Sequence, residues 1–185
     1  MMAPNAECQK YYKDDDIVIS GISGRFPNCE TFDEFKEKLF DGTDILDKEQ
    51  SRWPDGICGA VTKIGVLSNL EKFDSTFFNV HPKLAERLDP QIRAMLESTY
   101  EAFVDAGVNP TSLRGSNTAV VVATTNNDYA DWWSAEPTRV NGYEFLGCTR
   151  TMFPNRISYS FDLKGPSYAV DSGSSGSLMA FEHAL

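Results

Sequence analysis

The chain has 185 residues, of which 41% are hydrophobic, and this is enough apolar material for one domain with a core. Its 27 acidic residues outnumber its 17 basic residues, so the formal net charge is -10 at pH 7. An acidic chain presents no basic field to phosphate backbones or anionic lipids, which argues against nucleic-acid and membrane-surface binding. The longest aliphatic run, residues 119–123, is far too short to cross a bilayer.

The cysteines are scattered along the chain, and no two of them form a C-x-x-C pair, so we expect neither a zinc ribbon nor a dithiol redox motif. They are Cys8, Cys29, Cys58 and Cys148. The N-terminus lacks the apolar run of a secretion signal. These features predict free thiols in a reducing cytoplasm and no metal site.

The first half of the chain predicts a strand and a helix. Residues 1–13 are a polar extension without a pattern, and Ile17–Ser20 predicts a buried strand that runs into a glycine-rich turn. Thr31 and Glu34 form a capping box for an amphipathic helix that ends near Gly42. The stretch from residue 44 to residue 68 has no sustained periodicity and predicts a long surface excursion.

The second half alternates helices and strands. Asp89 and Pro90 begin a helix that closes at Gly107, and its predicted buried stripe consists of Ile92, Leu96, Tyr100 and Phe103. The aliphatic residues 118–125 predict a strand covered on both faces in a mainly parallel sheet. Further elements are expected as a helix from Asn141, a strand over 167–170 and a last helix from about Ser174. The alternation indicates an α/β fold.

Residues 165–178 pass from a strand through small side chains into a helix, which is the arrangement of a nucleophile elbow. A side chain at the tip of such a turn faces the N–H groups and partial positive charge of the helix N-terminus, where an oxyanion would be stabilised. The same pattern fits a Ser/Gly turn with a serine N-cap. The local residues alone leave both readings open.

The same segment resembles the active-site stretch of β-ketoacyl synthase (ketosynthase) domains, which reads G-P-S-x-x-V-D-T-A-C-S-S-S-L. Other family motifs occur in order at 73–78, 89–107 and 155–165. The tracts Arg52–Pro54, Val80–Pro82 and Gly147–Met152 resemble animal-type fatty acid synthases more than a generic polyketide synthase. The resemblance implies a β-ketoacyl synthase N-terminal region over 14–185, an incomplete domain with the N-terminal half of a thiolase-like α/β fold.

The resemblance also implies an activity and partners. The family transfers an acyl chain from the phosphopantetheine of acyl carrier protein to an active-site nucleophile, and then condenses it with malonyl-carrier protein with loss of CO₂, as a 3-oxoacyl-[acyl-carrier-protein] synthase of fatty acid biosynthesis. No cofactor is expected to be bound to the chain itself. The family is usually homodimeric, and it pairs through the strand that corresponds here to residues 167–170.

The chain departs from the family at the nucleophile, because the catalytic cysteine falls on Ser174. A helix N-terminus lowers a thiol pKa enough to give a thiolate, whereas a serine hydroxyl stays protonated and requires a general base. Ser174 keeps the oxyanion contact through its backbone N–H. The two histidines that the family uses belong to a later region, so we expect the chain to be inactive in condensation.

Neither histidine of the chain is expected to act as the base. His183 lies on the face of the last helix opposite to Ser174, and His81 sits in a Val-His-Pro tract away from the catalytic motifs. Gly21–Gly24 predicts a structural turn rather than a nucleotide loop. The Trp132–Trp133 pair predicts packing.

Smaller departures suggest relaxed constraint around the acyl site. Ala123 stands where the family commonly has glycine, Gly176 where it has serine, and Pro154 is expected to interrupt a helix before Asn155. Because the family pattern continues beyond this chain, Val120, Val122 and Leu178 are expected to face water unless another chain covers them.

Three hypotheses follow. The chain is a ketosynthase fragment of the fatty acid synthase type, or alternatively of the polyketide synthase type, that does not condense; or it is part of a longer working synthase; or it is a pseudoenzyme that pairs with intact synthase subunits through residues 167–170 or holds an acyl carrier.

Overall fold

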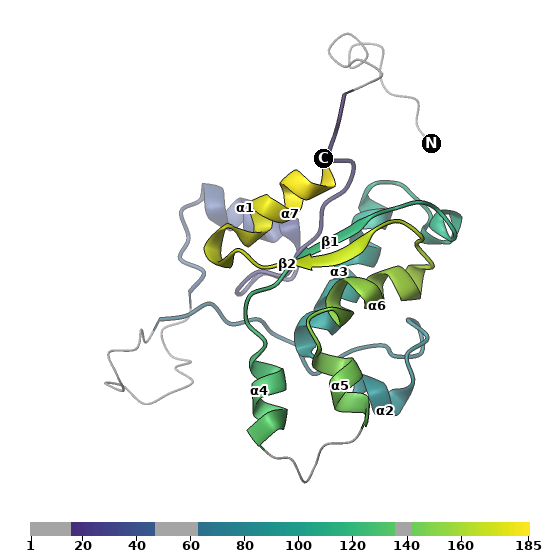
Figure 1. Cartoon of the computed structure of the whole chain (residues 1–185). Helices are drawn as coiled ribbons and strands as arrows, with labels where there is room; N and C mark the ends of the chain where they lie inside the picture. The colour runs from purple at the N-terminus through teal and green to yellow at the C-terminus, as the bar shows by residue number, and fades with distance from the viewer. Residues whose placement is uncertain (1–15, 47–62, 136–141) are drawn as a thin grey trace.

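The computed structural model describes residues 16–46, 63–135 and 142–185, and its centre is a pair of parallel strands (Figure 1). Strand β1 (Val120–Ala123) pairs with β2 (Ser167–Val170), with Val120 opposite Ser167 and Ala123 opposite Val170. The helices are α1 (Phe32–Phe40), α2 (Pro82–Ala85), α3 (Pro90–Asp105), α4 (Asp128–Ala135), α5 (Gly142–Cys148), α6 (Met152–Phe161) and α7 (Gly176–Ala184). The described ranges also contain two 3₁₀ turns, η2 (Pro110–Leu113) and η4 (Gly173–Ser175). The predicted α/β class and both of these strands are confirmed.

The core lies between α3, α6 and the inner face of the strand pair. Ile92 and Leu96 of α3 and Phe153 of α6 have no exposed surface, and Val122 of β1 is buried against the same cluster. Asp89 caps α3 as the sequence predicts, because its Oδ1 accepts from the Gln91 N–H at 2.7 Å. The helix stripe is confirmed, with its C-terminal members Tyr100 and Phe103 only partly buried.

Helices α6 and α7 lie on opposite sides of the strand pair (Figure 1). The expectation that Val120, Val122 and Leu178 face water is wrong for both valines, because Val122 is buried under α6 and Val120 packs partly buried against the core. Leu178 on α7 is 76% exposed, as expected. Cover on both faces of β1 is therefore confirmed, but only its inner face belongs to a closed core.

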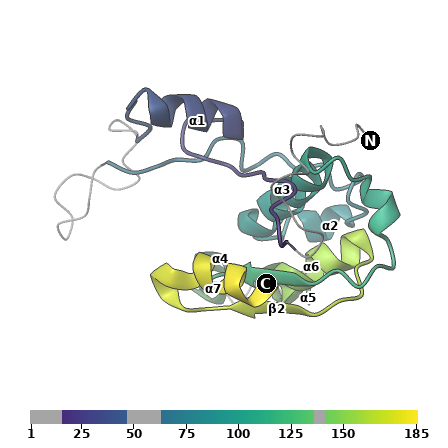
Figure 2. The same ribbon diagram turned by 90° about the horizontal axis from the view of Figure 1, so that it is seen from above.

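Helix α1 lies apart from the strand pair (Figure 2). The capping box is confirmed, since the Thr31 side chain accepts from the Glu34 N–H at 3.2 Å, and the helix ends just before Gly42. None of its residues is buried, and Phe40 is 80% exposed. The rings of Phe32 and Phe35 pack against that of Phe26, while Leu39 stays exposed like Phe40. The sequence therefore predicts this helix correctly, and only the C-terminal part of its apolar side is uncovered among the described residues.

The predicted strand at Ile17–Ser20 is wrong. These residues are extended but form no ladder, and Ile17, Val18 and Ile19 are 60–72% exposed. An aliphatic run becomes a buried strand only when a neighbouring strand pairs with it, and the strands of the described sheet pair only with each other.

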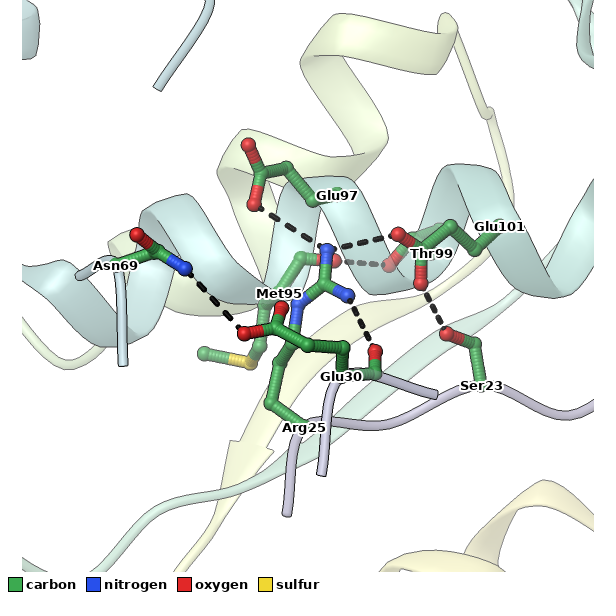
Figure 3. Close-up of polar contacts among 8 residues, drawn as sticks. All are labelled: Ser23, Arg25, Glu30, Asn69, Met95, Glu97, Thr99 and Glu101. Carbon is green, nitrogen blue, oxygen red and sulfur yellow. Dashed lines mark hydrogen bonds and ion pairs between the residues drawn. The ribbon is translucent and has the colours of Figure 1, made fainter. Parts of the chain in front are cut away.

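Polar contacts hold the segment after residue 20 against α3 (Figure 3). Arg25 Nη2 lies 2.7 Å from Glu101 Oε1 and 3.6 Å from Glu97 Oε2, and the Ser23 hydroxyl donates to Glu101 Oε2 at 2.5 Å. A Cβ on Gly21 would come within 2.2 Å of the Ala102 carbonyl oxygen, so only glycine fits there. The Gly21–Gly24 segment thus has the structural role that the sequence predicts.

The expected interruption at Pro154 is also wrong. Pro154 is the third residue of α6, and the helix runs on to Phe161. The N–H groups of a first helical turn have no acceptor within the helix, so proline removes no bond at this position. Pro154 is instead buried in the core.

Some expectations lie outside the described residues. The proposed helix start at Asn141 is one of them, although α5 begins at the next residue, and most of the excursion from 44 to 68 is another, since 47–62 are not described. Within the described ranges, no helix is long and apolar enough to span a bilayer.

Candidate active site

The elbow predicted at residues 165–178 is present as strand, turn and helix. Strand β2 ends at Val170, the turn η4 covers Gly173–Ser175, and α7 begins at Gly176. Ser174 is the middle residue of the turn, and its side chain is exposed. Gly173 has a φ of +58°, in the left-handed region where a side chain is strained, so glycine suits this tip.

Local hydrogen bonds fix the turn on either side of Ser174. The Gly173 N–H donates to Asp171 Oδ1 at 3.4 Å, and the Ser175 hydroxyl donates to the Ser172 carbonyl oxygen at 2.9 Å. No side chain caps α7, because Ser175 makes no N-cap bond. The first N–H groups of α7 and its partial positive charge are therefore available to an anion formed at Ser174.

Arg150 joins the elbow to the end of the neighbouring strand. Its Nη1 donates to Asp171 Oδ2 at 2.7 Å, and its Nη2 donates to the Thr125 carbonyl oxygen at 2.7 Å. The carboxyl ends of parallel strands lie at one edge of a sheet, so one guanidinium reaches both loops. The sequence analysis missed this positioning role, since no local pattern links Arg150 to residues 21 and 25 positions away.

Two departures from the family pattern contact each other beneath the elbow. A Cβ placed on Gly176 would lie 3.3 Å from the Cβ of Ala123, which is closer than ordinary carbon contacts. The larger residue on β1 thus faces the smaller one on α7. This complementary pairing argues against the relaxed constraint expected from the sequence.

The structure gives both histidines partners other than Ser174. His183 Nδ1 lies 3.3 Å from the Tyr168 hydroxyl, and His81 caps α2 by accepting from the Lys83 N–H at 3.3 Å. Among the described residues, the Ser174 hydroxyl has no hydrogen-bond partner. The described part of the chain therefore brings no base to Ser174.

Neither cysteine of the described residues takes the place of the catalytic thiol that the family has at position 174. Cys29 and Cys148 are free and buried, as the sequence predicts for thiols without a redox motif, while Cys8 and Cys58 lie outside the described residues. Burial raises the pKa of the Cys148 thiol, and the carboxylates of Asp89 and Glu144 raise it further. Cys148 is therefore protonated at neutral pH and has the character of a structural thiol.

The remaining motif candidates pack or pair within the fold. Trp133 is buried with the Arg87 guanidinium 4.5 Å from its ring centre, in keeping with the predicted packing role, and Trp132 is 51% exposed. Within the described ranges, no cluster of histidine, cysteine and carboxylate side chains has the arrangement of a metal site.

Comparison with known proteins identifies the family of this chain and proteins that share its fold. The family model of the β-ketoacyl synthase N-terminal domain matches residues 14–185. A fatty acid synthase of Anser anser anser is 45% identical over 170 residues, which cover 92% of this chain and 48% of that protein. A mellein synthase of Phaeosphaeria nodorum is 43% identical over 183 residues, which cover 90% of this chain and 10% of that protein.

Solved ketosynthases share the fold. The oxazolomycin ketosynthase domain of Streptomyces albus JA3453 superposes with a TM-score of 0.79 at 31% identity, covering 92% of this chain and 32% of its own. The module 6 ketosynthase of the bacillaene synthase of Bacillus subtilis 168 superposes with a TM-score of 0.73 at 31% identity, and the match covers 89% of this chain and 28% of that ketosynthase. The thiolase-like fold expected from the sequence is confirmed for the N-terminal part, and the chain spans about half or less of each relative.

Proposed function

Because the chain belongs to the β-ketoacyl synthase family, we propose that it forms the N-terminal region, residues 14–185, of a 3-oxoacyl-[acyl-carrier-protein] synthase with Ser174 at the nucleophile position. The observation that carries this proposal is the elbow, in which an exposed Ser174 lies between the end of β2 and the uncapped start of α7. This geometry directs backbone N–H groups toward charge that develops at residue 174.

The substrates follow from the family. Acyl chains arrive as thioesters on the phosphopantetheine of acyl carrier protein, and malonyl-carrier protein supplies the two-carbon unit in the cytoplasm. The 45% identity with a fatty acid synthase favours fatty acid biosynthesis. A polyketide synthase is the alternative, because a mellein synthase is 43% identical over a similar share of the chain.

The reaction has two halves, and serine disfavours both. In the first, the nucleophile attacks the acyl thioester and the carrier thiol leaves; a serine must lose its proton to a base, and His81 and His183 are engaged elsewhere. In the second, malonyl-carrier protein loses CO₂, and the resulting carbanion attacks the carbonyl carbon of the acyl group, so that a carbon–carbon bond forms and the enzyme's nucleophile leaves. An oxygen ester accepts a carbanion less readily than a thioester does. We therefore propose that the chain, as its sequence stands, does not catalyse condensation.

Mass spectrometry tests the nucleophile position. The purified chain and its Ser174→Cys variant are incubated with acyl-CoA, with Ser134→Cys as the matched control, because Ser134 is also an exposed serine but lies in the last turn of α4. Acylation should be faster at residue 174 than at residue 134, and absent from Ser174→Ala. Equal acylation of the two introduced thiols would contradict the proposed site.

A condensation assay tests the proposed lack of activity. The unaltered chain is supplied with acyl-CoA and malonyl-carrier protein, and 3-oxoacyl product is sought by mass spectrometry. We expect none from the unaltered chain. Any product lost in Ser174→Ala would overturn the proposal of inactivity while supporting the nucleophile position.

A second candidate function is pairing with another synthase chain through β2, including a homodimer. The Val120 N–H donates to the Pro166 carbonyl oxygen at 2.8 Å, and the Thr124 N–H donates to the Val170 carbonyl oxygen at 3.0 Å. Since alternate residues of a parallel strand face opposite neighbours, the N–H of Ala169 faces the other edge of β2. No described strand pairs with that edge.

Ala169→Pro tests this pairing, because it removes an N–H from the open edge without removing a donor from the β1 ladder. We expect the variant to lose co-purification with a full-length synthase, or its own dimer peak in size-exclusion chromatography, while its circular dichroism spectrum is unchanged. Monomeric behaviour of the unaltered chain together with no capture of a synthase would refute the pairing.

A further inference from the structure

Arg156 of α6 is a partly buried cation without a counter-ion. Its Nε has no accessible surface and no hydrogen-bond partner, and among the described residues no carboxylate lies within ion-pair distance of it. Burial lowers the pKa of the guanidinium. A charge removed from water is costly unless it is paired, so the site lacks an anionic partner within this part of the chain.

A pocket of about 560 Å³ opens at this guanidinium, between the start of α2 and one side of α6. Its polar side chains are those of Arg156, Asn155, Asn79, His81 and Tyr159, and its apolar wall includes Met152. His81 accepts a hydrogen bond at Nδ1, so its neutral ring carries the proton on Nε2 and is a donor. The lining therefore holds one fixed positive charge, two amides, an imidazole and a phenol, and no carboxylate.

The neighbouring surface is also basic. A second pocket, of about 550 Å³, shares Asn79 and Tyr159 with the first, and Arg114 and Lys164 line it together with Asp162. Lys164 pairs with Asp162 at 2.6 Å, and Arg114 donates to the Ser160 carbonyl oxygen at 3.4 Å. In a chain with a net charge of -10, this side of α6 is a local excess of positive charge.

We propose that the pocket at Arg156 binds the oxyanion of a small molecule, a carboxylate or a phosphate. A guanidinium presents parallel N–H groups that match two oxygens of either anion, and the side-chain amides of Asn79 and Asn155 are positioned in the lining to add donors. The apolar wall at Met152 suits a short carbon chain attached to the anion. None of the pocket's residues belongs to the elbow at Ser174, so this site goes beyond the proposed nucleophile position.

Isothermal titration calorimetry of the full chain with malonate and with inorganic phosphate tests the proposal. Sodium chloride at equal ionic strength is the control for screening of charge by salt. Arg156→Met removes the charge and keeps much of the side-chain length. Arg114→Met is the matched control, since it removes an arginine from the adjacent pocket only. We expect saturable binding to the unaltered chain and to Arg114→Met, weakened about tenfold or more in Arg156→Met.

The two anions distinguish the source of the oxyanion. Binding of malonate alone assigns a carboxylate, and binding of phosphate alone assigns a phosphate. No saturable binding of either anion, or equal binding by both arginine variants, would overturn the proposal.

A measurement on the unaltered chain covers the case in which Arg156→Met does not fold. Side-chain amide resonances of Asn79 and Asn155 should shift on titration with the anion that binds, whereas the amide of Asn109, which caps η2 elsewhere, should not. Shifts that are absent from Asn79 and Asn155, or that are the same at Asn109, would also overturn it.

Discussion

The contact between Gly176 and Ala123 predicts a coupled pair of substitutions beneath the elbow. A Cβ at residue 176 would lie 3.3 Å from the Ala123 Cβ, short of the roughly 3.5–4.0 Å of ordinary carbon contacts. The family resemblance places serine at 176 and glycine at 123. We therefore expect Gly176→Ser to be tolerated poorly in this chain and well in the presence of Ala123→Gly.

The magnitude follows from two opposing effects. Overpacking typically costs about 1–3 kcal/mol, while replacing glycine by serine in a helix recovers about 0.4 kcal/mol. Ala123→Gly alone costs about 0.5–1 kcal/mol in a strand, but it removes the methyl group that the serine meets. The double variant should therefore lose less unfolding free energy than the two single variants lose in sum, and the difference should be about 1 kcal/mol or more.

Urea unfolding followed by circular dichroism measures this coupling in a double-mutant cycle. Gly142 provides the matched control, because it also begins a helix and has open space where its Cβ would lie. Gly142→Ser should be additive with Ala123→Gly. If Gly176→Ser and Ala123→Gly are also additive within about 0.5 kcal/mol, the reasoning from the contact is refuted.

Three further predictions concern charge. The thiol of Ser174→Cys should have a pKa about 0.5–1.5 below that of Ser134→Cys, because a helix N-terminus favours an anion and a C-terminus opposes it by about 0.3–1 kcal/mol each. The dependence of the alkylation rate on pH measures both pKa values, and equal values would contradict this prediction. Adding Arg150→Gln should raise the pKa of the thiol at 174, because Asp171 loses its counter-ion, and an unchanged or lower pKa would contradict this. Burial raises the pKa of Asp89, so its contribution to stability is lost as pH rises through that raised value. The unfolding free energy of Asp89→Asn relative to the unaltered chain should thus increase from about pH 4 toward neutral, and a flat difference would exclude this effect.

Local signals predicted the elements that depend on neighbouring residues in the sequence. The cap at Asp89 and the spacing of Ile92 and Leu96 define α3 without reference to the rest of the chain. The strand, turn and helix at the elbow were predictable for the same reason, because glycine and serine after an aliphatic run indicate a turn, but the local residues left a nucleophile elbow and a serine-capped turn both open. At Ile17–Ser20 the aliphatic pattern gave a wrong prediction, because an extended segment becomes a buried strand only if a neighbouring strand pairs with it.

Contacts between distant residues were not predictable from one sequence. Arg150 reaches Asp171 and Thr125 across the strand ends, and no periodicity marks such a pair. The contact of Gly176 with Ala123 did leave a signal, namely two departures from one family pattern with opposite changes in size. That signal identifies a contact only when the spatial neighbourhood is known.

The elbow is well placed for experiments that separate chemistry from folding. The closed core lies on the α3 and α6 side of the strands, whereas on α7 only Gly176 is buried and Leu178 is largely exposed. Ser174 is exposed ahead of that helix, so exchanging it for cysteine or alanine removes no buried surface. A change in acylation at residue 174 therefore reports on the nucleophile and the helix terminus, because the core that sets stability lies on the opposite face of the strands.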